Sequence, residues 1–255
     1  MTSDNRKSQI KQMLLQQKFV SVSKMAEFFS VTEETIRRDL RMLENEGIVT
    51  RTHGGAILKA KVSSSFERQE FRTILLPSKA AMADTAKPFV QNGFCIFMDS
   101  STTVQTLFPQ IQDLQLTIVT DSIDIMMACS SLPNIRLYAL GGLYTPNARC
   151  FSSSQGRNLL ENLYFDIAFI SCRTISLSEG LCDSNVDEAA TKCLAAQHAS
   201  KTIAMVDHTK FDNVSFAKIC DLEEIDVLIS DKELDDQWMQ VLQKKQVDVL
   251  ISRPS

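Results

Sequence analysis

The sequence has 255 residues, of which 44% are hydrophobic and 23% charged, and this length and balance favour a globular protein of two unequal domains. No apolar run approaches the roughly 18 residues that cross a bilayer, and the polar start of the chain speaks against a secretory signal, so we expect a cytoplasmic protein without membrane contact. The net charge of −4 divides unevenly, because residues 1–60 carry ten Lys or Arg and seven Asp or Glu (+3), whereas the remainder carries 17 and 24 (−7). A basic head on an acidic body is typical of a protein that contacts nucleic acid through its head alone.

The first residues predict two helices in succession. Ile10, Met13 and Leu14 mark one face of a helix over residues 4–17. A short second helix follows, and Ser21 or Ser23 is expected to cap its start. Its buried face recurs at i, i+3, i+4 and i+7 and consists of Val22, Met25, Ala26 and Phe29.

A third helix is predicted to begin after Thr32, a favoured N-cap residue, and to end near Gly47. Its inner face repeats at i, i+4 and i+7 as Ile36, Leu40 and Leu43. The remaining side chains face outward and are Glu33, Thr35, Arg37, Arg38 and Arg41. Two short helices joined by a tight turn, the second basic on its outer face, form a helix-turn-helix unit whose second helix fits the major groove of DNA.

A β-rich run over residues 48–57 follows and contains the pair Gly54-Gly55. This run predicts a hairpin wing, with Arg51 and His53 against the DNA backbone. Periodicity alone leaves a second interpretation open, in which the first 57 residues are a helical domain with a solvated arginine face.

The literal string is more specific than its periodicity. Residues 31–40 (VTEETIRRDL) and 43–56 (LENEGIVTRTHGGA) resemble the signature of the DeoR family of bacterial regulators. The resemblance implies a winged helix-turn-helix domain over residues 1–57 that binds a double-stranded DNA operator. The candidate DNA-binding residues are Thr32, Glu33, Thr35, Arg37, Arg38, Arg41, Arg51 and His53.

Residues 58–74 are predicted to be a linker, because residues 59–65 are rich in Lys and Ser and poor in apolar residues. Residues 75–255 then alternate strand-like and helix-like segments, with a helix at 102–111 and another at 153–163. Pro88 should kink or end the first helix of this part. The strand candidates are mostly continuous apolar runs, at 93–98, 115–119, 135–140, 165–170, 202–206, 226–229 and 247–251. Continuous apolar strands indicate a parallel sheet covered on both faces, so the fold class is α/β, a winged helix-turn-helix domain followed by a doubly wound domain.

Three predicted strand ends carry groups suited to a ligand, which in such sheets binds beyond the carboxyl ends of the strands. They are Asp99-Ser100-Ser101-Thr102-Thr103, which opens a helix, Thr120-Asp121-Ser122, and Gly141-Gly142. Hydroxyls and backbone N–H groups at a helix start suit an anion, and glycines allow close approach. The alternative for the first run, and the favoured one when that run is taken alone, is a helix cap, and the alternative for the glycine pair is a tight turn.

The resemblance to the DeoR family extends over this part and implies a body that resembles ribose-5-phosphate isomerase and senses phosphorylated sugars or related metabolites. By resemblance, Ser100 to Thr103 hold the phosphate, whereas Asp99, Asp183, Glu188 and Lys210 face the sugar. The full set of candidate effector-binding residues is Asp99, Ser100, Ser101, Thr102, Thr103, Asp121, Gly141, Gly142, Arg173, Asp183, Glu188 and Lys210.

The sequence departs from the family pattern in two places. Ser152-Ser153-Ser154 stands where many members carry Gly, and Ser171-Cys172-Arg173-Thr174 stands where many have a glycine-rich turn. Arg173 either adds a phosphate contact or narrows the pocket.

These observations predict a sequence-specific transcriptional regulator, a repressor of sugar or related carbon-metabolism genes that is released by a phosphorylated metabolite. A homodimer or homotetramer is expected, because operators are usually paired half-sites. The alternative is a sugar-phosphate isomerase-like enzyme, in which carboxylates and a lysine move protons. A third hypothesis, a metal or redox sensor, is disfavoured because the seven cysteines are scattered and the three histidines do not cluster with them, so neither a metal nor a cofactor is expected.

Overall fold

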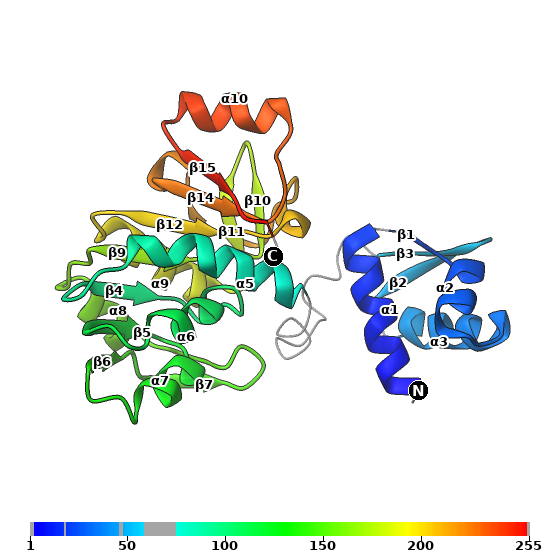
Figure 1. The fold of residues 1–255 in the computed structure, drawn as a ribbon, viewed down its shortest axis with the longest axis horizontal. Helices are drawn as coiled ribbons and strands as arrows, with labels where there is room; N and C mark the ends of the chain where they lie inside the picture. Colours follow the sequence, from blue (N-terminus) through cyan, green and yellow to red (C-terminus); the bar gives the residue numbers. More distant parts are fainter. Residues whose placement is uncertain (1–2, 18, 46–47, 59–74, 254–255) are drawn as a thin grey trace. The chain divides into compact units, whose positions relative to one another are not determined.

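The computed structural model describes residues 3–17, 19–45, 48–58 and 75–253, which form parts of two compact units, residues 1–74 and 75–255. We call these the N-terminal unit and the C-terminal unit (Figure 1). Within these described stretches, no helix combines the length and apolarity needed to cross a membrane.

The N-terminal unit consists of three helices and a small antiparallel sheet. Its elements are α1 (Ser3–Gln17), β1 (Phe19–Ser21), α2 (Val22–Phe29), α3 (Glu33–Asn45), β2 (Val49–Thr52) and β3 (Gly55–Leu58). The three predicted helices and the hairpin wing are confirmed. The predicted core is confirmed as well, since the inner faces of the helices meet in one buried cluster.

Three local expectations for this unit need correction. Strand β1 was not predicted, and it pairs with β3 to give the order β1-β3-β2, because a three-residue strand is too short to produce an alternating pattern. Ser21 occupies the N-cap position of α2, but its hydroxyl lies 2.9 Å from the Ser23 hydroxyl and makes no capping bond. The Thr32 cap is confirmed, because its Oγ1 accepts from the backbone N–H of Thr35 at 3.3 Å. The predicted linker, residues 58–74, begins one residue too early, because Leu58 is the last residue of β3. The predicted cap at Gly47 and the rest of the linker, residues 59–74, lie outside the described residues.

The C-terminal unit is built on a seven-stranded sheet whose neighbouring strands are all parallel. Its strands, in spatial order, are β15 (Asp248–Ile251), β14 (Val227–Ser230), β12 (Thr202–Met205), β9 (Ile167–Ile170), β4 (Cys95–Met98), β5 (Leu116–Thr120) and β6 (Ile135–Ala139). All seven predicted strands are therefore confirmed, as is the doubly wound α/β class. The chain order reverses between β4 and β9, and open α/β sheets bind ligands at the carboxyl ends of the two strands beside such a reversal, a place we call the crevice between β4 and β9.

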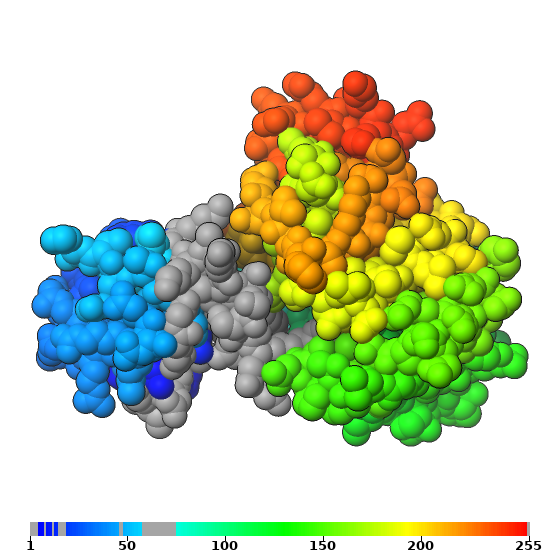
Figure 2. Space-filling model, turned by 180° about the vertical axis from the view of Figure 1, so that it is seen from behind, coloured from blue at the N-terminus to red at the C-terminus, as the bar shows by residue number. Residues whose placement is uncertain are grey.

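Helices cover both faces of the sheet. One face packs on α5 (Leu76–Ala86), α6 (Phe108–Ile111) and α7 (Ile123–Cys129), and the other on α8 (Ser154–Leu160), α9 (Val186–Gln197) and α10 (Asp236–Lys244). Side chains alternate between the two cores, as Ile96 and Met98 enter the first and Phe97 the second. Figure 2 shows α10, in red, at the upper edge of this unit.

Two small antiparallel sheets were missed by sequence reasoning. One has the order β10-β11-β13, with β10 (Thr174–Ser176), β11 (Gly180–Asp183) and β13 (Ala217–Cys220). The other is the hairpin of β7 (Leu143–Thr145) and β8 (Cys150–Ser152). Each of these short strands mixes polar and apolar residues, so it lacks the continuous apolar run by which the strands of the main sheet are recognised.

Proline governs two helix ends in this unit. Helix α5 ends at Ala86 and a 3₁₀ turn, Lys87–Phe89, follows around Pro88, which confirms the predicted break. The single helix predicted over 102–111 is wrong, because a 3₁₀ turn, Val104–Leu107, precedes the four-residue α6. Pro109 has no N–H to give to the carbonyl of Gln105, so a continuous α-helix through this segment would lose that bond.

Candidate functional sites

The outer face of α3 is basic and its inner face is fixed to α1. Arg37, Arg38 and Arg41 are exposed, whereas Asp39 is buried beside the apolar residues of the helix. The Asp39 carboxylate accepts from Arg6 Nε at 2.5 Å and from Arg6 Nη2 at 3.2 Å. This bidentate buried pair holds α3 on α1 and so orients the basic face.

The arginines of this face differ in how far they are already neutralised. Arg37 pairs with Glu33 at 2.8 Å, and Arg41 pairs with Glu34 at 3.0 Å. Arg38 has no ionic partner among the residues that the structure describes. Its full charge is therefore available to a phosphate or a base edge, whereas Arg37 and Arg41 must first break their ion pairs with glutamates.

The other predicted DNA-contacting residues lie at the start of α3 and on the wing. The hydroxyls of Thr32 and Thr35 are 2.9 Å apart at the helix start. His53 is exposed at the tip of the hairpin, and Arg51 is exposed on β2, where it pairs with Glu44 at 2.6 Å. Both elements thus present polar side chains to solvent, as a DNA-contacting surface requires.

In the C-terminal unit the crevice between β4 and β9 is organised by Asp99, which is fully buried. Its Oδ1 accepts from the N–H of Ser101 at 2.8 Å and its Oδ2 from the N–H of Ser171 at 2.8 Å. Asp99 therefore links the loop after β4 to the turn after β9 across the switch point. This geometry fits a residue that fixes the conformation of the loop by accepting hydrogen bonds from its backbone.

The predicted run of hydroxyls follows Asp99 directly in the chain and contacts a lysine that sequence reasoning missed. Ser100 and Thr103 are buried, and the Ser101 hydroxyl caps the following turn by accepting from the N–H of Val104. Thr102 Oγ1 accepts from Lys79 Nζ at 2.9 Å. Lys79 comes from the first turn of α5 and is only 2% exposed. A lysine early in a predicted helix gives no sequence signal that distinguishes it from a solvated one.

Two further cations approach the same place. Lys210 Nζ lies 4.0 Å from Asp207 Oδ2, at the carboxyl end of β12. Burial lowers the pKa of Lys79 to about 8, with Asp207 opposing and Lys210 reinforcing the shift. Burial also lowers the pKa of Lys210, which Asp207 opposes and Arg173 reinforces. Arg173 and Lys79 thus both lie close enough to Lys210 for like-charge repulsion, which an anion bound beside Lys210 would relieve.

Lys192 on α9 has a different environment. It is 2% exposed, and its ammonium group donates to Asp183 Oδ2 at 2.7 Å and to the carbonyl of Ser171 at 3.0 Å. It also lies 3.3 Å from Asp99 Oδ2. Lys192 thus neutralises two of the carboxylates that were predicted to face a sugar.

The remaining predicted residues lie around this centre at different distances. Asp121 is buried at the end of β5, and Gln105 bridges that step to the hydroxyl loop by donating to the carbonyl of Ser100 and to Ser122 Oγ. Glu188 is buried in the first turn of α9. The pair Gly141-Gly142 follows β6, two strands from β4 and so roughly 10 Å away.

The glycine pair and the two departures from the family pattern have local explanations. A Cβ on Gly142, whose φ is 138°, would lie 2.3 Å from the carbonyl of Ser152. Ser153 caps α8 and donates to the carbonyl of Gly141, so the serine run links the start of α8 to the turn that contains the glycine pair. The Ser171 hydroxyl donates to the carbonyl of Met205, which fixes the second departure between β9 and β12.

Thiol or metal chemistry has little support in the described residues. No group of three or more His, Cys, Asp or Glu side chains converges there as metal ligands would. Burial raises the pKa of Cys129 to about 11 and that of Cys172 well above its ordinary value. These thiols are protonated at neutral pH and are weak nucleophiles.

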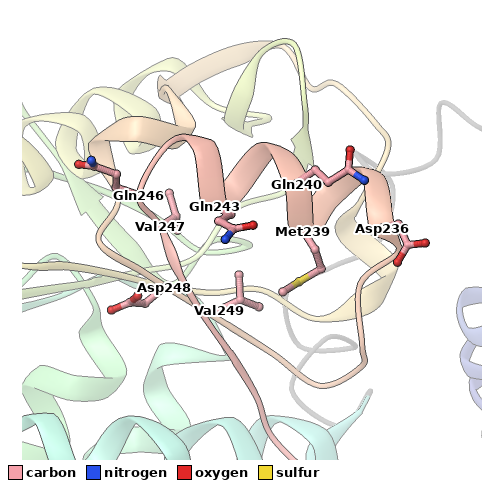
Figure 3. A pocket seen from close by; sticks show the side chains of 8 residues that line it. All are labelled: Asp236, Met239, Gln240, Gln243, Gln246, Val247, Asp248 and Val249. Carbon is pink, nitrogen blue, oxygen red and sulfur yellow. The ribbon is translucent and has the colours of Figure 1, made fainter.

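A groove of about 550 Å³ lies elsewhere, along α10 and the edge strand β15 (Figure 3). Its lining residues are Asp236, Met239, Gln240, Gln243, Gln246, Val247, Asp248 and Val249. The lining contains two carboxylates and no cation, so it suits an anionic ligand less well than the crevice at β4 and β9 does.

Comparison with known proteins matches both units. A family model described as the DeoR-like helix-turn-helix domain matches residues 6–62, and one described as the DeoR C terminal sensor domain matches residues 76–232. The uncharacterized HTH-type transcriptional regulator YulB of Bacillus subtilis (strain 168) is 32% identical over 244 residues, 96% of this chain and 95% of that protein. The lactose phosphotransferase system repressor of Staphylococcus aureus (strain NCTC 8325 / PS 47) is 27% identical over 240 residues, 91% of this chain and 94% of that protein. A structure of ribose 5-phosphate isomerase A from Methanocaldococcus jannaschii is 15% identical, with a TM-score of 0.40 over 54% of this chain and 55% of that chain.

Proposed function

The chain belongs to the DeoR family of transcriptional regulators, and we propose that it represses genes of sugar metabolism until a phosphorylated sugar binds its C-terminal unit. The observation that carries the proposal is the contact of Lys79 with Thr102, which places a buried ammonium group on the hydroxyl loop. Lys210 and Arg173 add positive charge to the same crevice. The relative named as a lactose phosphotransferase system repressor supports a sugar-related role and repression.

DNA recognition is assigned to α3 and the wing. We propose that Arg38, Arg37 and Thr35 contact base edges or phosphates in the major groove, and that Arg51 and His53 contact the backbone. Because one such unit covers only a half-site, we propose that a homodimer or a homotetramer binds the operator. A regulator of chromosomal genes acts in the cytoplasm, which is the compartment we propose.

The test is a titration of the full chain against a labelled duplex from the region upstream of its own gene. Pentose and hexose phosphates are compared with the same sugars without phosphate, at constant ionic strength. At least one sugar phosphate should release the duplex, and its unphosphorylated form should not. Absence of duplex binding at moderate salt would refute the operator assignment, and binding that no sugar phosphate changes would refute the effector assignment.

The alternative, an isomerase-like enzyme, is less well supported. Asp99 accepts two backbone N–H groups and lies beside Lys192, and Asp183 accepts from the same ammonium group. Carboxylates neutralised in this way are poor general bases. We therefore propose that the C-terminal unit binds sugar phosphates without converting them, and clear turnover of pentose phosphates in an isomerisation assay would contradict this.

A further inference from the structure

The first turn of α5 is bonded at two points to the segment that carries the hydroxyl loop and at a third point to the end of β14. Lys79 Nζ donates to Thr102 Oγ1 at 2.9 Å, and the carbonyl of Lys79 lies 3.1 Å from the hydroxyl of Thr106, which also donates to the carbonyl of Thr103 at 2.6 Å. Ser78 hydrogen-bonds the carboxylate of Asp231. Side chain and main chain of one turn thus both contact the segment that carries the hydroxyl loop.

The third point of attachment is itself held firmly. Asp231 Oδ1 accepts from the N–H of His208 at 2.7 Å, and its Oδ2 lies 2.8 Å from His208 Nδ1. Burial alone would raise the pKa of Asp231, but the hydrogen bonds from His208 and Ser78 lower it below its ordinary value. The carboxylate is therefore ionised at neutral pH and anchors Ser78 at the end of β14.

The first turn of α5 is also where the chain enters the C-terminal unit. Helix α5 begins at Leu76 and is the first element of the C-terminal unit. Leu75, the residue before it, has φ 56° and ψ 30°, a left-handed conformation that is unfavourable for a bulky side chain. Strained residues of this kind persist only where surrounding contacts hold them, and they are frequent in switch regions.

We propose that the first turn of α5 couples the effector site to the DNA-binding unit. A phosphate group on the loop Ser100–Thr103 binds the ammonium group of Lys79. The resulting shift of the Lys79 main chain moves the start of α5 and thereby the residues that join the units. The inference rests on the proposed function and names its regulation. A ligand shifts a conformational equilibrium only as far as it binds one state better than the other. The ammonium group of Lys79 can supply this difference in affinity. Its interaction energy with a dianion depends on the distance between the two charges, and a shift of the first turn of α5 would change that distance.

The first test measures binding of inorganic phosphate to the full chain by calorimetry at constant ionic strength. Lys79→Met removes the charge, and Lys87→Met, an exposed lysine just beyond the end of the same helix, is the matched control. Loss of a charge-assisted contact should weaken phosphate binding about tenfold or more in the first variant and leave the control unchanged. Equal phosphate affinity in Lys79→Met and the wild type would overturn the role of Lys79.

The second test separates coupling from binding. Thr106→Val deletes the hydroxyl that lies 3.1 Å from the Lys79 carbonyl and 2.6 Å from the Thr103 carbonyl. Thr85→Val, whose hydroxyl bonds within α5 to Ala81, is the control for the loss of a hydroxyl-to-carbonyl bond of this kind. Phosphate affinity is measured with and without the operator duplex, because coupling between two ligands is reciprocal. Thr106→Val should bind free phosphate like the wild type but lose most of the effect of the duplex, whereas Thr85→Val should keep it.

The outcomes distinguish this inference from the proposed function. If the wild type binds no phosphate, the effector assignment itself fails and the coupling role fails with it. If the wild type binds phosphate and responds to the duplex, but Thr106→Val responds equally, the effector assignment stands and the coupling role of this turn is overturned.

Discussion

The substitution Asp39→Asn should unfold the N-terminal unit while sparing the C-terminal unit. It keeps the size of the side chain but removes the charge that faces Arg6, which is only 8% exposed. Removing one partner of a buried ion pair costs about 3–5 kcal/mol, because the other charge is left buried. A domain of about 57 residues is stable by only about 3–8 kcal/mol, so the loss is comparable to its whole stability.

The assay is thermal unfolding of the full chain followed by calorimetry, together with operator binding. The transition of the N-terminal unit should fall sharply or vanish, and operator binding should vanish with it. Glu34→Gln is the control, because its pair with Arg41 is more than half exposed and should contribute under about 1 kcal/mol. The double variant Arg6→Met/Asp39→Leu should recover much of the loss, since it removes both buried charges. If the double variant is as unstable as the sum of its two single variants, the buried pair is not the cause.

Three further predictions concern individual cations. Arg38→Ala should weaken operator binding by about 1–3 kcal/mol in fluorescence anisotropy, and a change below about twofold would argue against its contact. Lys192→Met should lower the stability of the C-terminal unit by about 3–5 kcal/mol, roughly 10 °C in the calorimetric midpoint, because it leaves Asp99 and Asp183 without their counter-charge. Phosphate binding should weaken about tenfold from pH 7 to pH 9, because the Lys79 pKa of about 8 means that its proton is lost over this range. Lys79→Arg should abolish that decline, since arginine stays charged, and a decline that persists in this variant would point to another group.

The strands of the main sheet could be predicted because each is a nearly continuous apolar run, as in residues 167–170 and 202–205, and burial on both faces imposes that pattern. The sequence did not predict β10, β11 and β13, whose short strands depend on long-range pairing such as that of Cys182 with Lys218. The break before α6 was predictable in principle, since Pro109 lies inside the predicted helix.

The candidate site was predictable in part. The hydroxyl run Ser100–Thr103 follows a strand directly, so its place at the edge of the sheet follows from local sequence. Lys79 lies 23 residues before Thr102, and only the packing of α5 on the sheet brings them together. Arg6 and Asp39 are 33 residues apart, and a surface lysine or arginine in a helix has the same local signature as a buried one.

Two lysines near the crevice, Lys79 and Lys192, are almost fully buried but differ in their partners. The difference decides which of them suits an anionic ligand, and local sequence does not reveal it. Lys192 is surrounded by Asp183, Asp99 and a backbone carbonyl, so an arriving phosphate would have to compete with two carboxylates and would be repelled by them. Lys79 contacts a neutral hydroxyl, and its pKa is lowered because burial outweighs the attraction of Asp207. A dianion therefore gains more at Lys79, since it stabilises an ammonium group that burial disfavours and meets no carboxylate hydrogen-bonded to that group in the contact with Thr102. On this reasoning Lys192 holds the fold of the crevice together, whereas Lys79 responds to what enters it.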